Sequence, residues 1–434
     1  MDTSIIATAL VTISQDFNGF DNLLFGSDIG PTYRLPSLQG IGGSGLYSMA
    51  MVMFPEVTPP SLSMMMSAIF GTVISMAGVL GPILGGIIAR YTTWRWIFLM
   101  NVPCGVLIMI LTSVAWFRHG ADSTAKRITF AQMDYLGGTL LLSASVLLIF
   151  SLQEGGNREF SWSGPVLIST LVLAGVCFVL FVTWQAFLYK KESSILAIIP
   201  LRLARRRAIA ASVLYTTITG FSFLVVLISL PQRFQIVNLD DTVMAGIHLP
   251  PMLISVGFGS AVGGMASVKR NNTFPIPAKM YVFEMIHGLR IGLTMSNVTL
   301  MVTVEAEFED TAVAQGIISQ ARIFGGSIAI AVSSIIFNTK AQASLVNVLT
   351  PQQLSTLHKS PAVIAMFSLS EQIAARSVFA ASFNETLRVC TYVSALGVVV
   401  TLFMYQKHPR DVMEKKNEMM EHQRRNMEEQ MMER

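Results

Sequence analysis

Long apolar runs recur along the chain and are separated by shorter polar segments. The runs are rich in Leu, Ile, Val and Gly and carry few charges. They also have about the 20 residues that an α-helix needs to cross the hydrocarbon core of a membrane. The pattern therefore predicts an all-α, polytopic transmembrane helix bundle of about 10–11 spans. The ten candidate spans are 36–54, 64–88, 94–115, 134–152, 164–188, 208–230, 243–268, 280–304, 311–338 and 387–405.

The composition agrees with this pattern. Of the 434 residues, 52% are hydrophobic and 13% are charged, whereas a soluble domain carries about 25% charged residues. A water-soluble protein of this length would need a more polar surface, so the composition argues against a cytosolic enzyme. The net charge of +4 is too small to indicate a nucleic-acid partner.

Basic residues are unevenly distributed between the connections. The connections 116–133, 189–207 and 269–279 hold twelve Lys and Arg residues, while 89–93, 153–163, 231–242 and 305–310 hold three. Since cytoplasmic loops are enriched in Lys and Arg, the first set is expected to be cytoplasmic. Counting spans from there puts the segment 406–434 outside, yet this tail is dense in basic residues. After residue 270, the side of the membrane given by counting spans therefore disagrees with the side indicated by the basic residues.

Sequence motifs for enzymatic chemistry are missing. The chain has no G-x-x-x-x-G-K-[ST], no H-x-x-H or H-E-x-x-H and no G-x-S-x-G, which argues against a P-loop, a histidine metal site and an esterase elbow. Cys104, Cys177 and Cys390 lie inside apolar runs without C-x-x-C spacing and indicate packing residues. We therefore expect no cofactor, no metal and no enzyme activity. The function that remains for a polytopic membrane protein is the movement of a solute across the bilayer.

Glycine and proline interrupt the apolar run 64–88. Gly81-Pro82 and Gly85-Gly86 remove one backbone donor and leave one helix face without side chains. Such a segment kinks and lets a neighbouring helix approach closely, as hinges in transporters require. The segment is therefore a candidate for gating and helix packing.

Two further runs share this character. The span 36–54 has a second glycine face, and 94–115 opens on an interfacial aromatic and cationic anchor followed by helix-breaking residues. The residues concerned are Gly40, Gly42, Gly43, Gly45, Trp94, Arg95, Asn101 and Pro103.

Three of these runs together resemble the major facilitator superfamily. They are LQGIGGSGLYSMAM (38–51), GPILGGII (81–88) and WRWIFLMNVPCG (94–105). They are most similar to its fourteen-helix drug:proton antiporter branch, common among fungal multidrug and toxin efflux pumps. MDTSIIATAL at the start, AGIHLPP (245–251) and AQGIISQARIFGGSIAIAV (314–332) resemble further helices of that branch. The resemblance implies two helix bundles that rock around a midplane cavity.

The chain departs from the family pattern in several places. Only about 23 residues separate the first-helix piece from Leu38, where the family has two more helices. Pro36 stands where the family's fourth helix carries an Arg, and an eleventh helix is missing near Arg270. That omission would explain the conflict between parity and charge. The expectation is a shortened or mis-spliced copy of an efflux pump.

Two residues are candidates for coupling or substrate contact through the resemblance. Asp2 matches the first-helix acid of the family, and Gln39 belongs to the fourth-helix motif. The alternative for Asp2 is a residue exposed at a chain end.

Ionisable residues within apolar spans are candidates because their desolvation is costly. Glu284 and His287, followed by Arg290, share one flank of a helix, and a Glu–His pair inside a membrane can pass protons. The alternative is internal charge compensation or a degraded helix. Arg322 fits a position typical of the family, with an interfacial snorkelling arginine as its alternative.

The resulting expectation is a proton-coupled secondary transporter that exports small amphipathic compounds. Its partners would be a small-molecule substrate, protons and the lipid bilayer of the plasma membrane, or alternatively the vacuolar membrane. The expected organisation is a first-helix remnant with an irregular junction (1–35), the transporter domain (36–405) and a charged cytoplasmic tail (406–434). A truncated, non-transporting paralogue or partner subunit is the alternative function.

Overall fold

The structure is a computed structural model. Asp2, Gln39, Gly40 and Trp94 lie outside the residues that it describes, as do the segment 1–35 and all of the tail except residue 421. It describes residues 42–43, 45–47, 49–50, 66–93, 95–118, 132–157, 161–191, 195–256, 279–307, 310–346, 348–350, 352–354, 357, 361–405 and 421.

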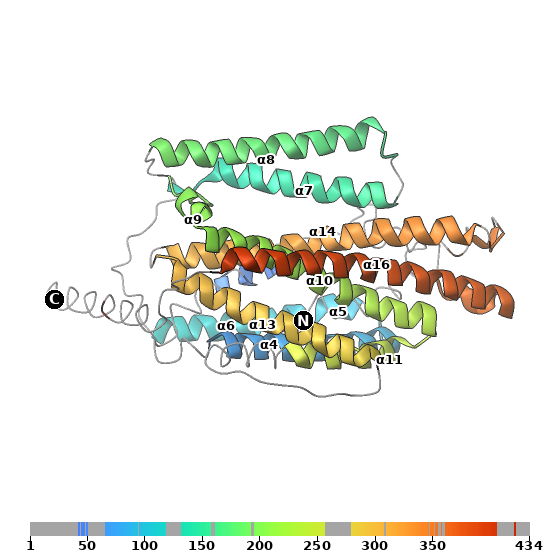
Figure 1. The fold of residues 1–434 in the computed structure, drawn as a ribbon. Coiled ribbons are helices and arrows are strands. Elements are labelled where there is room, and N and C mark those ends of the chain that lie inside the picture. The colour runs from blue at the N-terminus through green and yellow to red at the C-terminus, as the bar shows by residue number, and fades with distance from the viewer. Residues whose placement is uncertain are drawn as a thin grey trace.

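Helices make up almost all of the described chain (Figure 1). Among the described residues, β structure is limited to one isolated bridge between Met133 and Leu196. The helices are α4 (Met66–Tyr91), α5 (Arg95–Leu99), α6 (Asn101–Arg118), α7 (Tyr135–Asn157), α8 (Pro165–Lys191), α9 (Leu201–Arg205), α10 (Arg207–Arg233), the π-helix η2 (Phe234–Asn238), α11 (Thr242–Ile247), α13 (Lys279–Glu305), α14 (Thr311–Leu345), the 3₁₀-helix η4 (Pro361–Met366) and α16 (Leu369–Met404).

The predicted all-α, polytopic class is confirmed. Within the described ranges, seven helices are long and apolar enough to cross a membrane. A shorter apolar stretch, Thr242–Val256, includes residues 243–256 of the predicted span 243–268. Helix α13 has the length of a span but is less apolar than the seven.

The last predicted span, 387–405, has the wrong start. Helix α16 begins at Leu369, and α14 extends to Leu345, so both ends of the predicted loop 339–386 are helical. The polar residues in the first half of α16 lower its hydropathy and hide it from an apolar pattern. Ser368 nevertheless caps this helix, since its side chain accepts from the Glu371 N–H in a capping box.

The core of the described chain lies around α10. Residues of α10 such as Val225, Leu227 and Leu230 are buried together with Met252 and Ile291 of neighbouring helices. Figure 1 shows α10 in the middle of the bundle, with α14 and α16 above it and α13, α11 and α4 below. The pair α7–α8 lies at the edge of the bundle beyond α14, with its apolar side chains largely exposed. Exposed apolar side chains are what a lipid-facing helix requires.

Arginines near the start of α10 bond the turn between α13 and α14. Arg206 donates to the carbonyl oxygen of Glu305 and to the carboxylate of Glu307, and Arg202 donates to Asp310 at 2.6 Å. The connection 305–310 therefore lies at the same end of the bundle as the basic segment 189–207. Assigning these two connections to opposite sides of the membrane was wrong.

The same end of the bundle holds the end of α16. Arg207 donates to the carbonyl oxygen of Tyr405 at 2.7 Å. Since α13 ends where α10 begins, the two helices run in opposite directions, and Lys279 at the start of α13 lies at the other end. Placing 269–279 on the same side as 189–207 is therefore wrong at Lys279. Tyr405, the residue before the tail, therefore lies on the same side as the basic segment 189–207. At this residue the position in the bundle agrees with the side that the basic residues of the tail indicate.

Candidate functional site

Helices α4 and α11 meet through backbone rather than side chains. Gly81, Pro82, Gly85 and Gly86 are buried on one face of α4. A Cβ atom on Gly86 would lie 2.6 Å from the carbonyl oxygen of Thr242, which real Cβ contacts do not reach. The structure thus places another helix against the glycine face, at a distance that only glycine permits.

Polar contacts hold the two ends of this helix pair. The Thr242 hydroxyl donates to the carbonyl oxygen of Gly86 at 3.3 Å, and Arg90 forms an ion pair with Asp241. Beyond the end of α11, the Ser75 hydroxyl of α4 donates to the carbonyl oxygen of Leu253 at 2.5 Å. Polar contacts therefore hold α4 against α11 and against the helical residues that follow α11.

Of the predicted ionisable residues of α13, Glu284 is buried in the bundle, and His287 and Arg290 are half-buried. Glu284 is 4% exposed, and both its carboxylate oxygens lack a hydrogen-bond partner. Nε2 of His287 and one terminal nitrogen of Arg290 are buried without a partner as well. Gly288 brings α13 against the backbone of Met252. Since buried charged groups are normally paired, this cluster is a strong candidate for a proton or ligand site.

Arg322 of α14 is buried separately from that cluster. Its side chain is within 3.4 Å of the Tyr47 hydroxyl, while its Nε atom has no hydrogen-bond partner. Its backbone packs directly on Gly220 of α10. His287 of the α13 cluster is hydrogen-bonded to the backbone of Ser222, which lies two residues further along α10 than Gly220 and therefore on a different side of that helix.

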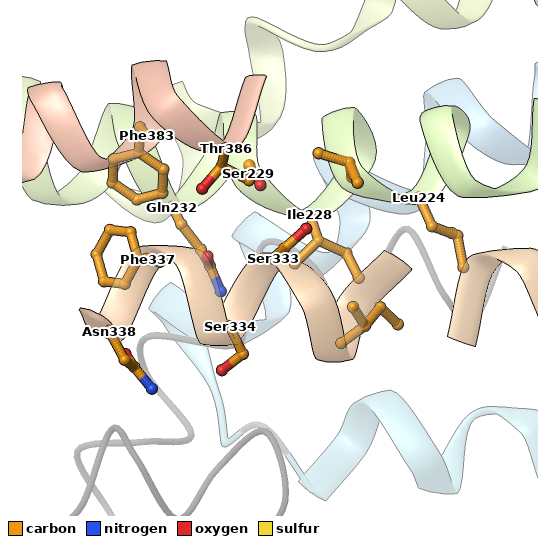
Figure 2. Close-up of a pocket in the computed structure, with 12 residues that line it drawn as sticks. Leu224, Ile228, Ser229, Gln232, Ser333, Ser334, Phe337, Asn338, Phe383 and Thr386 are labelled. Carbon is orange, nitrogen blue, oxygen red and sulfur yellow. The ribbon is translucent and has the colours of Figure 1, made fainter. Parts of the chain in front are cut away.

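A pocket opens between α10, α14 and α16 (Figure 2). The space between protein atoms there, counted together with the solvent at its open side, is about 530 Å³. Its lining residues are apolar or polar but uncharged: Leu224, Val225, Ile228, Ser229, Gln232, Ile330, Ser333, Ser334, Phe337, Asn338, Phe383 and Thr386.

The sequence analysis did not single out these pocket residues. A signal was present, because Ser229 and Gln232 are three residues apart in an otherwise apolar helix, and Ser334 and Asn338 are four apart. Such spacings place polar side chains on one helix face. Which helices would bring these faces together is not readable from a single sequence.

The remaining predicted residues are scattered. Arg95 begins α5, and Asn101 and Pro103 lie in the first turn of α6, where a proline is tolerated because its missing N–H is not needed. Gly42 and Gly45 are exposed, with no described atom within 4 Å of a Cβ on either. Neither glycine therefore packs against a described helix, and their gating role stays a prediction.

A metal site is not evident in the described part of the chain, where no three His, Cys, Asp or Glu residues group closely enough to hold an ion. The described architecture is instead that of a multi-pass membrane transporter, with apolar helices, a glycine-lined helix contact and an uncharged internal pocket. Residues 4–330 match the family model of the Major Facilitator Superfamily. The chain belongs to this superfamily.

Similar curated proteins agree with this assignment. An MFS-type transporter of Fusarium mangiferae, FPY5, is 31% identical and covers 88% of this chain, which spans 69% of that protein. A rubrofusarin-specific efflux pump of Gibberella zeae is 28% identical over 71% of this chain and 60% of its own length. Multidrug resistance protein 3 of Bacillus subtilis is 28% identical over 60% of this chain and 52% of its own length. The recognised resemblance to drug efflux transporters of this superfamily is confirmed.

Proposed function

We propose that this protein exports small amphipathic compounds across the plasma membrane and drives export with proton entry. The observation that carries the proposal is the match to the superfamily over residues 4–330, together with relatives named as efflux pumps. Coupling would use buried ionisable groups, because moving a proton through a bundle requires a site that can gain and lose charge away from water. Glu284 and His287 are the described candidates, with Arg322, Asp2 and Gln39 as further proposed coupling or substrate residues.

Gating would use the α4–α11 contact. Backbone-to-backbone packing at Gly86 and Gly246 lets two helices separate or close with few side chains to rearrange. Alternating access needs such a movable contact on one side of a central site. The face formed by Gly81, Pro82 and Gly85 extends the proposed gating contact along α4.

Export is tested with Nile red, a neutral amphipathic dye, in cells that express the full chain. The proposal expects lower dye accumulation than in control cells, and loss of this difference when a protonophore collapses the proton gradient. Glu284→Gln should reduce the gradient-dependent part, whereas Glu385→Gln, the same change on a half-buried, ion-paired residue of α16, should not. Export that persists without the gradient would contradict proton coupling.

A second candidate function is a non-transporting membrane paralogue or partner subunit. It is favoured by the α13 cluster, because buried unpartnered charges also arise where a helix has lost the residues that once satisfied them. Correct delivery to the plasma membrane without export of any dye would support this function over the first.

A further inference from the structure

Helix α8 lies at the outside of the bundle, with one face turned away from the protein (Figure 1). Its buried residues recur on one side of the helix. Val172, Val179 and Lys190 lie on the opposite side, because spacings of seven and eighteen residues return to nearly the same direction on an α-helix. Both valines are 60% exposed, and Lys190 is exposed as well. This outward face is therefore apolar along the helix and ends on a positive charge.

Positive charge is concentrated where this face ends. The segment 189–207 contains six basic residues and one acidic residue. Three of its arginines already bond protein oxygens at the turn between α13 and α14 and at the end of α16. The other three basic residues are exposed and form no ion pair with a described acidic residue: Lys190, Lys191 and Arg205.

Aromatic rings hold two of these three cations in place. The Lys191 ammonium lies 5.7 Å from the centroid of the Phe187 ring, and the Arg205 guanidinium lies 5.5 Å from that of Tyr189. Both rings are about half exposed, as is typical of aromatic side chains at the boundary between hydrocarbon and lipid headgroups. A cation over a ring keeps its charge and its N–H donors available for a further partner.

The acidic residue at this end of the α7–α8 pair is turned inward. Asp134 is 7% exposed. Its carboxylate accepts from the Gly137 N–H at 2.7 Å, from the Trp184 indole at 2.9 Å and from the Gln185 amide at 2.6 Å. These bonds engage both carboxylate oxygens, so Asp134 does not pair with the exposed cations.

We propose that the end of α8 binds an anionic phospholipid of the cytoplasmic leaflet through Lys190, Lys191 and Arg205. The cations bond the headgroup, since Lys and Arg donate strongly to phosphate oxygens and this leaflet carries the anionic lipids. Eleven residues separate Val179 from Lys190, which is about 16 Å of helix, or roughly half of the hydrocarbon core. An acyl chain of the same lipid therefore lies along the outward face. The site is independent of the proposed export function.

Native mass spectrometry of the purified full chain in detergent tests the class of lipid. Phosphatidylserine and phosphatidylcholine with identical acyl chains are added separately, and the retained lipid gives a Kd for each. Because one basic residue near the membrane surface contributes about fivefold to the binding of an anionic lipid, phosphatidylserine should bind at least fivefold more tightly. A smaller difference would overturn the proposal.

Substitutions then locate the site. Lys191→Gln combined with Arg205→Gln should raise the Kd for phosphatidylserine at least tenfold and leave that for phosphatidylcholine unchanged. The matched control combines Lys340→Gln with Arg388→Gln, which removes one exposed lysine and one exposed arginine from other helices and should change neither Kd. An equal loss in both variants, or no loss in the first, would overturn the proposal.

A soluble competitor distinguishes a lipid from a free anion. Glycerophosphoserine has the headgroup of phosphatidylserine without its acyl chains. A hundredfold excess should leave phosphatidylserine bound, because contact between the acyl chain and the apolar outward face adds to the affinity. Displacement of the lipid by this competitor would show that the cations bind a soluble anion, and the proposed lipid site would be wrong.

Discussion

Gly246 of α11 lies against the carbonyl oxygen of Pro82 in α4, and a Cβ atom on Gly246 would lie 2.5 Å from that oxygen. The oxygen belongs to the backbone of a helix interior, so it cannot move aside as a flexible side chain would. The proline was predicted to kink its helix. Its observed role includes presenting this carbonyl to the neighbouring helix.

Replacing this glycine is expected to destabilise the bundle. Gly246→Ala forces α4 and α11 apart and should lower the free energy of unfolding by about 1–3 kcal/mol, the usual cost of overpacking. Thermal unfolding in detergent, followed by circular dichroism, measures the change. Gly175→Ala on α8 is the control, because no described atom lies within 4 Å of its Cβ position. A loss of stability as large in the control as at Gly246 would refute the packing argument.

The ion pair between Arg90 and Asp241 joins the same two helices at their exposed end. The two side chains are 50% and 41% exposed, and solvent-exposed ion pairs contribute at most about 1 kcal/mol. A double-mutant cycle with Arg90→Gln and Asp241→Asn should therefore give a coupling energy within that range, shrinking at high salt. A salt-independent coupling above about 2 kcal/mol would mean that the pair is desolvated in the membrane-embedded protein.

The direction of α16 predicts the side of the C-terminus. Tyr405 lies at the bundle end that holds Arg202 and Arg206, which the charge bias assigns to the cytoplasm. An epitope tag added after Arg434 should resist protease applied outside intact cells. A tag placed after Trp162, in the connection between α7 and α8 at the opposite end, should be cleaved. Cleavage of the C-terminal tag alone would reverse the assigned orientation.

Sequence patterns predicted the helices better than their ends and contacts. Apolar runs identified α7, α8 and α10 closely, because lipid imposes a composition that is visible without any partner. The start of α16 was missed although Ser368-Leu-Ser-Glu371 is a readable capping-box sequence, because its first turns are polar. The side assigned to 305–310 was wrong because parity counting assumes that every crossing has been identified.

The candidate sites also differ in how far the sequence alone predicts them. Glycine spacing and buried charge are local properties, so Gly86 and Glu284 were recognisable from the sequence. The pocket combines Gln232, Ser333 and Phe383 from helices separated by about 100 and 50 residues of chain. Only the packing of the three helices brings these residues together, and a periodic pattern in one helix says nothing about the register of its neighbours.

Substitutions of Glu284 are expected to affect thermal stability and export in different directions. Its two buried carboxylate oxygens have no hydrogen-bond partner, so removing the acid removes a desolvation cost without breaking a bond. Glu284→Gln and Glu284→Met are therefore expected to unfold at the same or a higher temperature than the wild type, with the methionine variant the more stable because it has no polar group to satisfy. Both should lose proton-coupled export.

Glu385→Gln is the matched control for this prediction. Its carboxylate is at the surface and bonds Arg388 at 2.9 Å, so the change should affect neither thermal stability nor export beyond the small contribution of an exposed pair. Groups retained at a cost to stability are commonly functional ones. Lower unfolding temperatures in both Glu284 variants would show instead that the carboxylate has a stabilising partner in the membrane, and its assignment as a coupling group would lose its physical basis.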